Sequence, residues 1–155
     1  MTDPVDGIMA VMECAFDPAW GEAWNRRQVS DALVLPGCHF ALIDDVGTIA
    51  GEIAEGAEPA GFYLTRSTLD EEELLLIAVT PQARGAGRGA ALLDHCIAAA
   101  GARGAARLFL EMRSGNTAER LYTARGFLPI GKRPDYYRSP GGARIDAITF
   151  ARDIG

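Results

Sequence analysis

The most constraining feature of the sequence is an apolar run, a glycine-rich turn and an alanine-rich run that follow one another over residues 73–100. Residues 73–79 are almost wholly apolar, which is typical of a strand buried on both faces. Residues 84–90 hold three glycines, and residues 91–100 have the composition of a helix. A strand, a glycine turn and a helix N-terminus form an anion site, because free backbone N–H groups and the positive end of the helix dipole point at one place. A phosphate-bearing ligand is therefore expected there.

Two well-known phosphate-binding patterns fit this turn poorly. The nucleoside-triphosphate loop needs a lysine directly after its last glycine, and the one lysine of the chain, Lys132, lies elsewhere, so this class is excluded. The dinucleotide fingerprint Gly-x-Gly-x-x-Gly/Ala matches Gly85, Gly87 and Ala90, and Glu111 lies about twenty residues further on, where a ribose-binding acid is expected. However, five residues separate the strand from the first glycine, whereas the fingerprint requires an immediate turn.

A third pattern, Gln/Arg-x-x-Gly-x-Gly/Ala, is matched by Arg84, Gly87 and Gly89. This turn resembles the acetyl-coenzyme A loop of the GNAT superfamily of N-acetyltransferases, in which such a turn holds the pyrophosphate of the cofactor. On this motif alone, a glycine-rich turn that binds no ligand remains an alternative.

Later segments carry the same resemblance. Residues 110–116 (Leu-Glu-Met-Arg-Ser-Gly-Asn) are similar to the Leu-Glu-Val-Arg-x-x-Asn segment of GNAT enzymes, and residues 121–127 (Leu-Tyr-Thr-Ala-Arg-Gly-Phe) to their Leu-Tyr-x-x-x-Gly-Phe segment. Within the superfamily the chain looks most like the bacterial ribosomal-protein alanine N-acetyltransferases, whose Arg-Arg-Asn-Tyr-Tyr and Glu-Asp-Ala-Ile segments resemble residues 133–137 and 145–148. The resemblance covers about residues 61–150 well and the first sixty poorly.

The resemblance implies a site for acetyl-coenzyme A as cosubstrate. In such a site, the strand backbone of Ile77, Ala78 and Val79 would pair with the pantetheine arm like an added strand. Asn116 would contact the cofactor as well. The pyrophosphate turn would comprise Arg84, Gly85, Ala86, Gly87, Arg88, Gly89 and Ala90.

The resemblance also implies roles for four side chains. Glu111 would be the general base that takes a proton from the attacking amine through water, and Tyr122 the general acid that protonates the departing thiolate. These residue types suit the chemistry, because acyl transfer to an amine needs a neutral nucleophile and a leaving group that does not return. An α-amine has a pKa of about 8, a thiol about 8.5 and tyrosine about 10. Tyr136 and Tyr137 would flank the acceptor.

Two positions depart from the pattern of the related enzymes. The spacing from Glu111 to Tyr122 is one residue shorter than is usual in them, so Asn116 matches when counted from the glutamate but not from the tyrosine. Ile145 stands where the branch has a glutamate before Asp146.

The expected order of elements indicates an α/β (α+β) chain with a mixed, mostly antiparallel sheet. A helix between strands 73–79 and 107–113 must cross over between parallel neighbours, and ligands bind beyond the carboxyl ends of such strands. The resemblance implies the GNAT acyl-CoA N-acyltransferase fold, in which this central parallel pair is splayed and helices flank the sheet. Helices are expected at 3–17, 21–35, 88–102 and 117–125, and strands at 39–43, 48–50, 61–66, 73–79, 107–113, 127–138 and 143–151.

Size and charge narrow the classes of function. A chain of 155 residues is expected to form a single domain, 1–155. The net charge of −6 argues against a nucleic-acid-binding surface. The sequence has no signal-peptide pattern and no apolar run of membrane-spanning length, so a cytoplasmic protein without membrane contact is expected. Three scattered cysteines and two distant histidines have no metal-ligand spacing, so no metal is expected.

The favoured function is acetyl transfer from acetyl-coenzyme A to the N-terminal α-amine of a protein or peptide, and the resemblance implies a ribosomal protein as partner. The alternatives are a GNAT enzyme for a small-molecule amine or a lysine side chain, a non-catalytic acetyl-coenzyme A-binding module, and a dinucleotide-binding oxidoreductase. Release of free thiol in the presence of amines would separate an enzyme from the silent module, and nicotinamide binding would identify the oxidoreductase.

Overall fold

The computed structural model of the chain describes residues 3–17 and 20–154. Its seven strands form one sheet in the order β2-β1-β3-β4-β5-β7-β6, and the β4–β5 pair is parallel whereas the other pairs are antiparallel. The elements in chain order are α1 (Pro4–Ala15), α2 (Arg26–Leu33), β1 (Cys38–Asp44), β2 (Ile49–Ala50), β3 (Pro59–Thr68), β4 (Glu71–Val79), the 3₁₀ turn η2 (Pro81–Ala83), α3 (Arg88–Ala102), β5 (Arg107–Arg113), α4 (Glu119–Ala124), β6 (Leu128–Arg138) and β7 (Arg144–Asp153).

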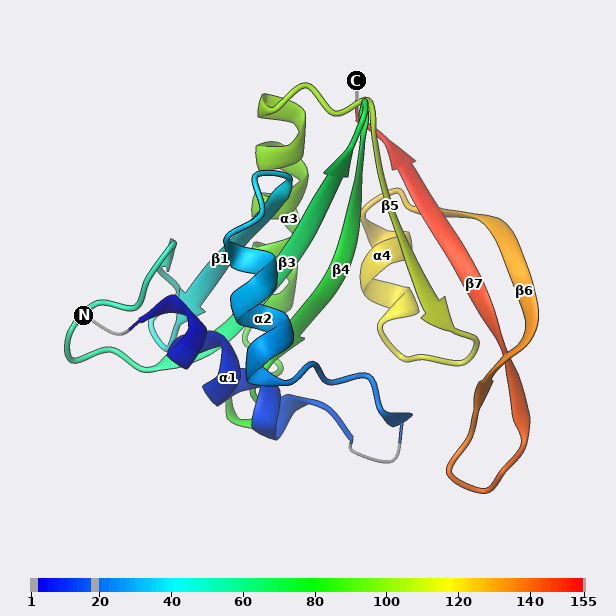
Figure 1. Ribbon diagram of the computed structural model, residues 1–155, viewed down its shortest axis with the longest axis horizontal. Helices are drawn as coiled ribbons and strands as arrows, with labels where there is room; N and C mark the ends of the chain where they lie inside the picture. The colour runs from blue at the N-terminus through cyan, green and yellow to red at the C-terminus, as the bar shows by residue number, and fades with distance from the viewer. Residues whose placement is uncertain (1–2, 18–19, 155) are drawn as a thin grey trace.

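Helices cover both faces of the sheet. Figure 1 shows α1 and α2 in front of the central strands and α3 behind them. Each face has its own apolar core: one cluster joins α1 and α2 to the sheet, and the other joins α3 and α4 to it. The predicted mixed sheet with flanking helices is confirmed. A dinucleotide-binding fold needs a mostly parallel sheet, so that alternative is wrong.

The central parallel pair separates along its length, as predicted. Pairing between β4 and β5 is confined to Glu71–Glu73 opposite Arg107–Phe109. Figure 1 shows the two strands meeting near the C-terminus of the chain and moving apart toward their carboxyl ends. In the same region, Leu64 and Thr65 of β3 pair with Leu76 and Leu74, so Leu75 is an extra residue in β4. Such a β-bulge bends its strand, and here it lies where β4 leaves β5.

The expectation that residues 73–79 are buried on both faces is wrong. Along β4, buried residues alternate with half-buried ones, among them Leu75 and Ile77. The reason is the separation of the central pair: beyond Glu73, β4 has lost its neighbour β5, and its side chains border an open space instead of a continuous sheet.

The second helix is shorter than the predicted 21–35. Asn25 is its N-cap: its side chain accepts a hydrogen bond from the backbone N–H of Gln28 at 2.9 Å, and the side chain of Gln28 accepts one from the N–H of Asn25 at 2.8 Å. This capping box starts the helix at Arg26. Residues 21–24 therefore lie outside any helix or strand, and they serve as part of a wall of the site described below. Among the described residues, every helix is too short or too polar to cross a lipid bilayer.

Gly61 in β3 leaves no space for a methyl group. A Cβ atom there would lie 2.8 Å from the carbonyl oxygen of Ala78 and 2.9 Å from Cδ1 of Leu92. We expect Gly61→Ala to destabilise the fold by about 1–3 kcal/mol through overpacking, measured as a lower melting temperature. Gly51→Ala is the matched control, because a Cβ there meets nothing within 4 Å. Equal losses in the two variants would contradict the packing explanation.

Candidate active site

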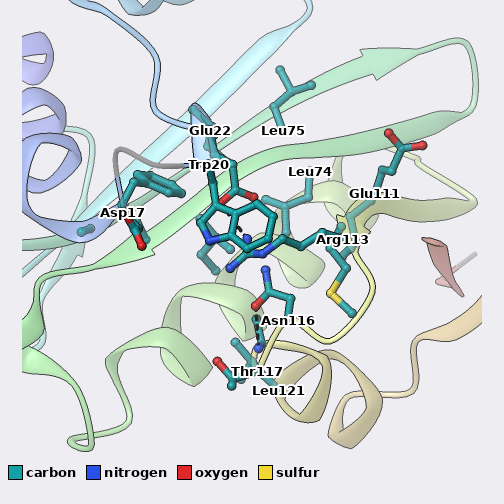
Figure 2. A pocket seen from close by; sticks show the side chains of 18 of the residues that line it. Asp17, Trp20, Glu22, Leu74, Leu75, Glu111, Arg113, Asn116, Thr117 and Leu121 are labelled. Atoms are coloured by element: carbon teal, nitrogen blue, oxygen red, sulfur yellow. Dashed lines mark hydrogen bonds and ion pairs between the residues drawn. The ribbon is translucent and has the colours of Figure 1, made fainter. Parts of the chain in front are cut away.

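The space between the separated ends of β4 and β5 forms a cleft of about 880 Å³. Its walls come from these two strands, the turn before α3, the start of α4, the α1–α2 connection and β6 (Figure 2). The structure therefore brings together, from four separate segments of the chain, ten of the predicted site residues: Ile77, Ala78, Val79, Arg84, Gly89, Glu111, Asn116, Tyr122, Tyr136 and Tyr137.

The glycine turn has the backbone geometry expected of an anion site. Gly85 and Gly87 have φ values of +83° and +78°, in the left-handed region that favours glycine. Gly87 is also the N-cap of α3, a helix of 15 residues. A Cβ atom built at either glycine would meet nothing within 4 Å. The turn thus presents an open backbone at a helix N-terminus, which suits a phosphate group. Of the other predicted turn residues, Ala86, Arg88 and Ala90 lie beside Arg84 and Gly89, which line the cleft.

The two arginines of the turn hold neighbouring segments in place. Arg84 lines the cleft and donates a hydrogen bond to the carbonyl oxygen of Ala15 at the end of α1, at 2.9 Å. Arg88 donates to the carbonyl oxygens of Asp45 and Ala86. The side chain of Arg88 therefore supports the turn after β1, and its backbone is the part that belongs to the glycine turn.

The edge of β4 offers backbone groups to the cleft. Beyond Glu73 this strand pairs with β3 on one side, while β5 has moved away on the other. Residues 77–79 lie on this stretch and line the cleft. An extended ligand can add to such an edge as a further strand would.

Glu111 places a carboxylate in the cleft from the middle of β5. Its side chain is 20% exposed and forms an ion pair with Arg133 of β6, with 3.0 Å between Oε2 and Nε. Arg133 is 61% exposed, and its guanidinium lies 4.7 Å from the ring centre of Tyr136. The carboxylate is thus held by a cation that is itself mostly exposed to water.

Tyr122 contributes a neutral phenol to the cleft. It lies on α4, is 6% exposed, and its ring packs edge-on against Phe127 with 5.7 Å between ring centres. Burial first, and then Cys96 and the negative charge of Glu22, raise the pKa of its hydroxyl above the ordinary value. At neutral pH the hydroxyl therefore keeps its proton, as a proton donor must.

The remaining predicted residues also lie in the cleft. The rings of Tyr136 and Tyr137 contact each other edge-on with 5.1 Å between centres. Burial, followed by the charges of Glu111 and Glu22, raises the pKa of Tyr137. Asn116 accepts a hydrogen bond from the N–H of Ala118 at 2.9 Å, so its side-chain oxygen stabilises the start of α4.

Three cleft residues that were not predicted as site residues form a cluster. Arg113 of β5 forms an ion pair with Glu22 at 2.7 Å, and its guanidinium lies 4.2 Å from the ring centre of Trp20. Figure 2 shows Trp20 stacked on Arg113 at the centre of the cleft, with Asn116 beside them and Glu111 to one side. Arg113 follows Glu111 by two residues, so alternation along a strand predicts a shared face. Trp20 lies in a 3₁₀ turn and Glu22 in the irregular stretch that follows it, and no periodicity in the sequence indicates where either side chain points.

The chain is similar to known proteins in sequence and in fold. Residues 36–129 match the family model of the acetyltransferase (GNAT) domain. A [ribosomal protein bS18]-alanine N-acetyltransferase of Escherichia coli strain K12 is 39% identical over 104 residues, which are 66% of this chain and 70% of that protein. The protein of the same description from Haemophilus influenzae is 35% identical over 100 residues, 64% of this chain and 68% of that protein. The crystal structure of the ribosomal-protein-S18-alanine N-acetyltransferase from Escherichia coli matches with a TM-score of 0.78 at 29% identity, over 97% of this chain and 88% of that one.

Proposed function

Because the chain belongs to the GNAT family of N-acetyltransferases, which use acetyl-coenzyme A, we propose that its acceptor is the N-terminal α-amine of a protein. The relatives described above are alanine N-acetyltransferases of a ribosomal protein, and an N-terminal alanine of a ribosomal protein is the acceptor that we propose for this chain. The observation that carries the proposal is that Glu111, Tyr122 and the open edge of β4 share one cleft.

Acetyl-coenzyme A supplies the acetyl group as a thioester, and the cleft has groups that fit each part of it. The backbone of residues 77–79 would bind the pantetheine arm at the edge of β4, and Asn116 would lie alongside. Residues 84–90 would hold the pyrophosphate at the N-terminus of α3, because Gly85 and Gly87 leave the backbone open there.

Glu111 would act on the acceptor as general base. The amine arrives as a cation, and the carboxylate that would receive its proton is paired with Arg133, a side chain exposed enough to turn into water. At pH 7, freeing an α-amine of its proton costs about 1 kcal/mol, whereas a lysine side chain costs about 4 kcal/mol. One carboxylate acting through water meets the first demand, which favours an α-amine as acceptor. Tyr136 and Tyr137 would flank the peptide.

Tyr122 would act on the leaving group as general acid. Its raised pKa keeps the hydroxyl protonated in the resting enzyme, and a thiolate is a strong enough base to take that proton when the carbon–sulfur bond breaks. A protonated amine loses two protons on becoming an amide. Glu111 would take the first and pass it to water, and the second would replace the proton that Tyr122 gives to the thiolate, so each turnover would release one proton to solvent.

The acceptor is tested with peptides. We expect the protein and acetyl-coenzyme A to add one acetyl group to peptides with a free N-terminal alanine or similar small residue, detected by mass spectrometry. Acetylation of small amines in preference to every peptide would contradict the proposed acceptor. Binding of acetyl-coenzyme A with no release of free thiol in the presence of any amine would indicate a non-catalytic binding module instead.

The cofactor site is tested through Gly87. Acetyl-coenzyme A should raise the melting temperature of the wild-type protein, since a ligand at a hundred times its Kd stabilises the native state by about 2.7 kcal/mol. Gly87→Asp should abolish this shift, because it puts a side chain and a negative charge where the pyrophosphate would bind. Gly104→Asp is the control for backbone strain: Gly104 has a φ of +89° and open surroundings, and it follows the other end of α3. A normal shift in Gly87→Asp would exclude this turn as the pyrophosphate site.

A further inference from the structure

The connection between α1 and α2 forms a wall of the cleft without belonging to the sheet. Phe16, Asp17, Trp20, Gly21, Glu22 and Trp24 all line the cleft from this side. At one end of the connection, Arg84 bonds the carbonyl of Ala15. At the other end, Asn25 begins α2 with its capping box.

Arg113 ties the middle of this connection to the end of β5. Its ion pair with Glu22 joins residues 91 positions apart, and both side chains are mostly shielded from water, at 20% and 23% exposed. The guanidinium also lies over the ring of Trp20, 4.2 Å from its centre, which adds a cation–π contact. An ion pair that is largely out of water and also stacked holds its partners more firmly than an exposed surface pair does.

The contacts of Arg113 with Glu22 and Trp20 lie next to Glu111, the proposed general base. Arg113 and Glu111 project from the same face of β5, one side-chain step apart, which is about 7 Å along a strand. An acceptor whose amine is at Glu111 therefore has its first side chain within reach of Arg113 and Trp20. The charge of Glu22 also reaches two phenols of the cleft, since it contributes to the raised pKa of both Tyr122 and Tyr137.

We propose that Arg113 is a positioning residue that fixes Trp20 and Glu22 as the wall against which the first residue of the acceptor binds. The inference rests on the proposed function. The ion pair and the ring contact of Arg113 are with Glu22 and Trp20 of the α1–α2 connection, and among the described residues no ion pair or side-chain hydrogen bond joins Arg113 to residues 77–79 or to the glycine turn. Its loss should therefore affect binding of the acceptor more than binding of acetyl-coenzyme A. A fixed wall beside the amine also limits the size of the first side chain, which gives the proposed preference for alanine a physical cause.

The test compares Arg113→Gln with the wild type in steady-state kinetics. With an alanine peptide, we expect the acceptor KM to rise roughly tenfold or more, because a small misplacement of a positioning group has large effects, while the KM for acetyl-coenzyme A stays within about twofold. The preference for alanine over leucine as first residue should shrink. Glu22→Gln should give the same pattern, and the double variant should lose little more than either single one, since both remove one contact.

Two further variants keep the test specific. Arg107→Gln removes an arginine from the closed end of the same strand, where it pairs with Asp153 and Glu71, and should leave both KM values unchanged. In a Trp24→Phe background, the remaining tryptophan is Trp20, so its fluorescence emission should change when Arg113→Gln removes the stacked guanidinium. Unchanged emission together with unchanged acceptor KM would overturn the proposal. If the wild type acetylates a different amine, the proposed function fails separately, and the same KM comparison with that amine decides the role of Arg113.

Discussion

Replacing Tyr122 by phenylalanine should lower kcat by about 10²- to 10⁴-fold and leave acetyl-coenzyme A binding intact. The substitution keeps the ring that packs on Phe127 and removes the hydroxyl alone. Because burial raises the pKa of this hydroxyl, the wild-type enzyme carries the proton throughout the neutral range, and the variant has none to give to the thiolate. Release of free thiol measures kcat, and the melting temperature with and without acetyl-coenzyme A measures binding.

Tyr63→Phe is the matched control for this experiment. Tyr63 is also a buried tyrosine with a raised pKa, and it lies outside the cleft, where its hydroxyl is bonded to His95 at 2.8 Å. Loss of that hydroxyl should lower stability slightly and leave kcat unchanged. If Tyr122→Phe turns over at the wild-type rate, Tyr122 is a packing residue and another donor protonates the thiolate.

Replacing Glu111 by glutamine should lower kcat/KM by about 10²- to 10³-fold near pH 6.5, with partial recovery as the pH rises past 8. The loss is expected to be larger at low pH because of the acceptor. Below its pKa of about 8 an α-amine is mostly protonated and needs a base, and above that pH it is mostly neutral. The variant should thus gain more from alkaline pH than the wild type does. A pH–rate profile of both proteins with one peptide measures the effect.

Glu73→Gln controls for the loss of a carboxylate on the central strands. Glu73 lies on β4, pairs with Arg66 at 2.7 Å, and does not line the cleft. Its substitution should leave the pH–rate profile unchanged. A loss in Glu111→Gln that is the same at every pH would show that Glu111 orients the acceptor without taking its proton.

Local patterns in the sequence predicted the core of this fold. The apolar runs before and after α3 mark β4 and β5, and the crossover rule makes them parallel neighbours. The glycine turn is also a local pattern: Gly85 and Gly87 stand where the backbone takes a positive φ, which favours glycine. These signals depend on residues close together in the chain, so a single sequence is enough to predict them.

What the sequence did not predict depends on contacts between distant segments. The extra residue Leu75 in β4 is defined by its register against β3, which no local pattern encodes. The pairing of Glu111 with Arg133 needs the hairpin of β6 and β7 to fold back along β5. The start of α2 was missed because the capping box at Asn25 and Gln28 was not recognised, and the irregular segment before it then looked helical.

One peptide tests the central claim most directly: a free N-terminal alanine followed by an internal lysine, incubated at pH 7 with the protein and acetyl-coenzyme A. Fragment-ion mass spectrometry then locates the acetyl group, so the two amines compete within one molecule. The smaller cost of deprotonating an α-amine, together with the cleft that holds Glu111 and Tyr122, predicts acetylation of the alanine nitrogen well ahead of the lysine. An acetyl group found mainly on the lysine, or no acetylation of the peptide while another amine is turned over, would contradict the α-amine as acceptor.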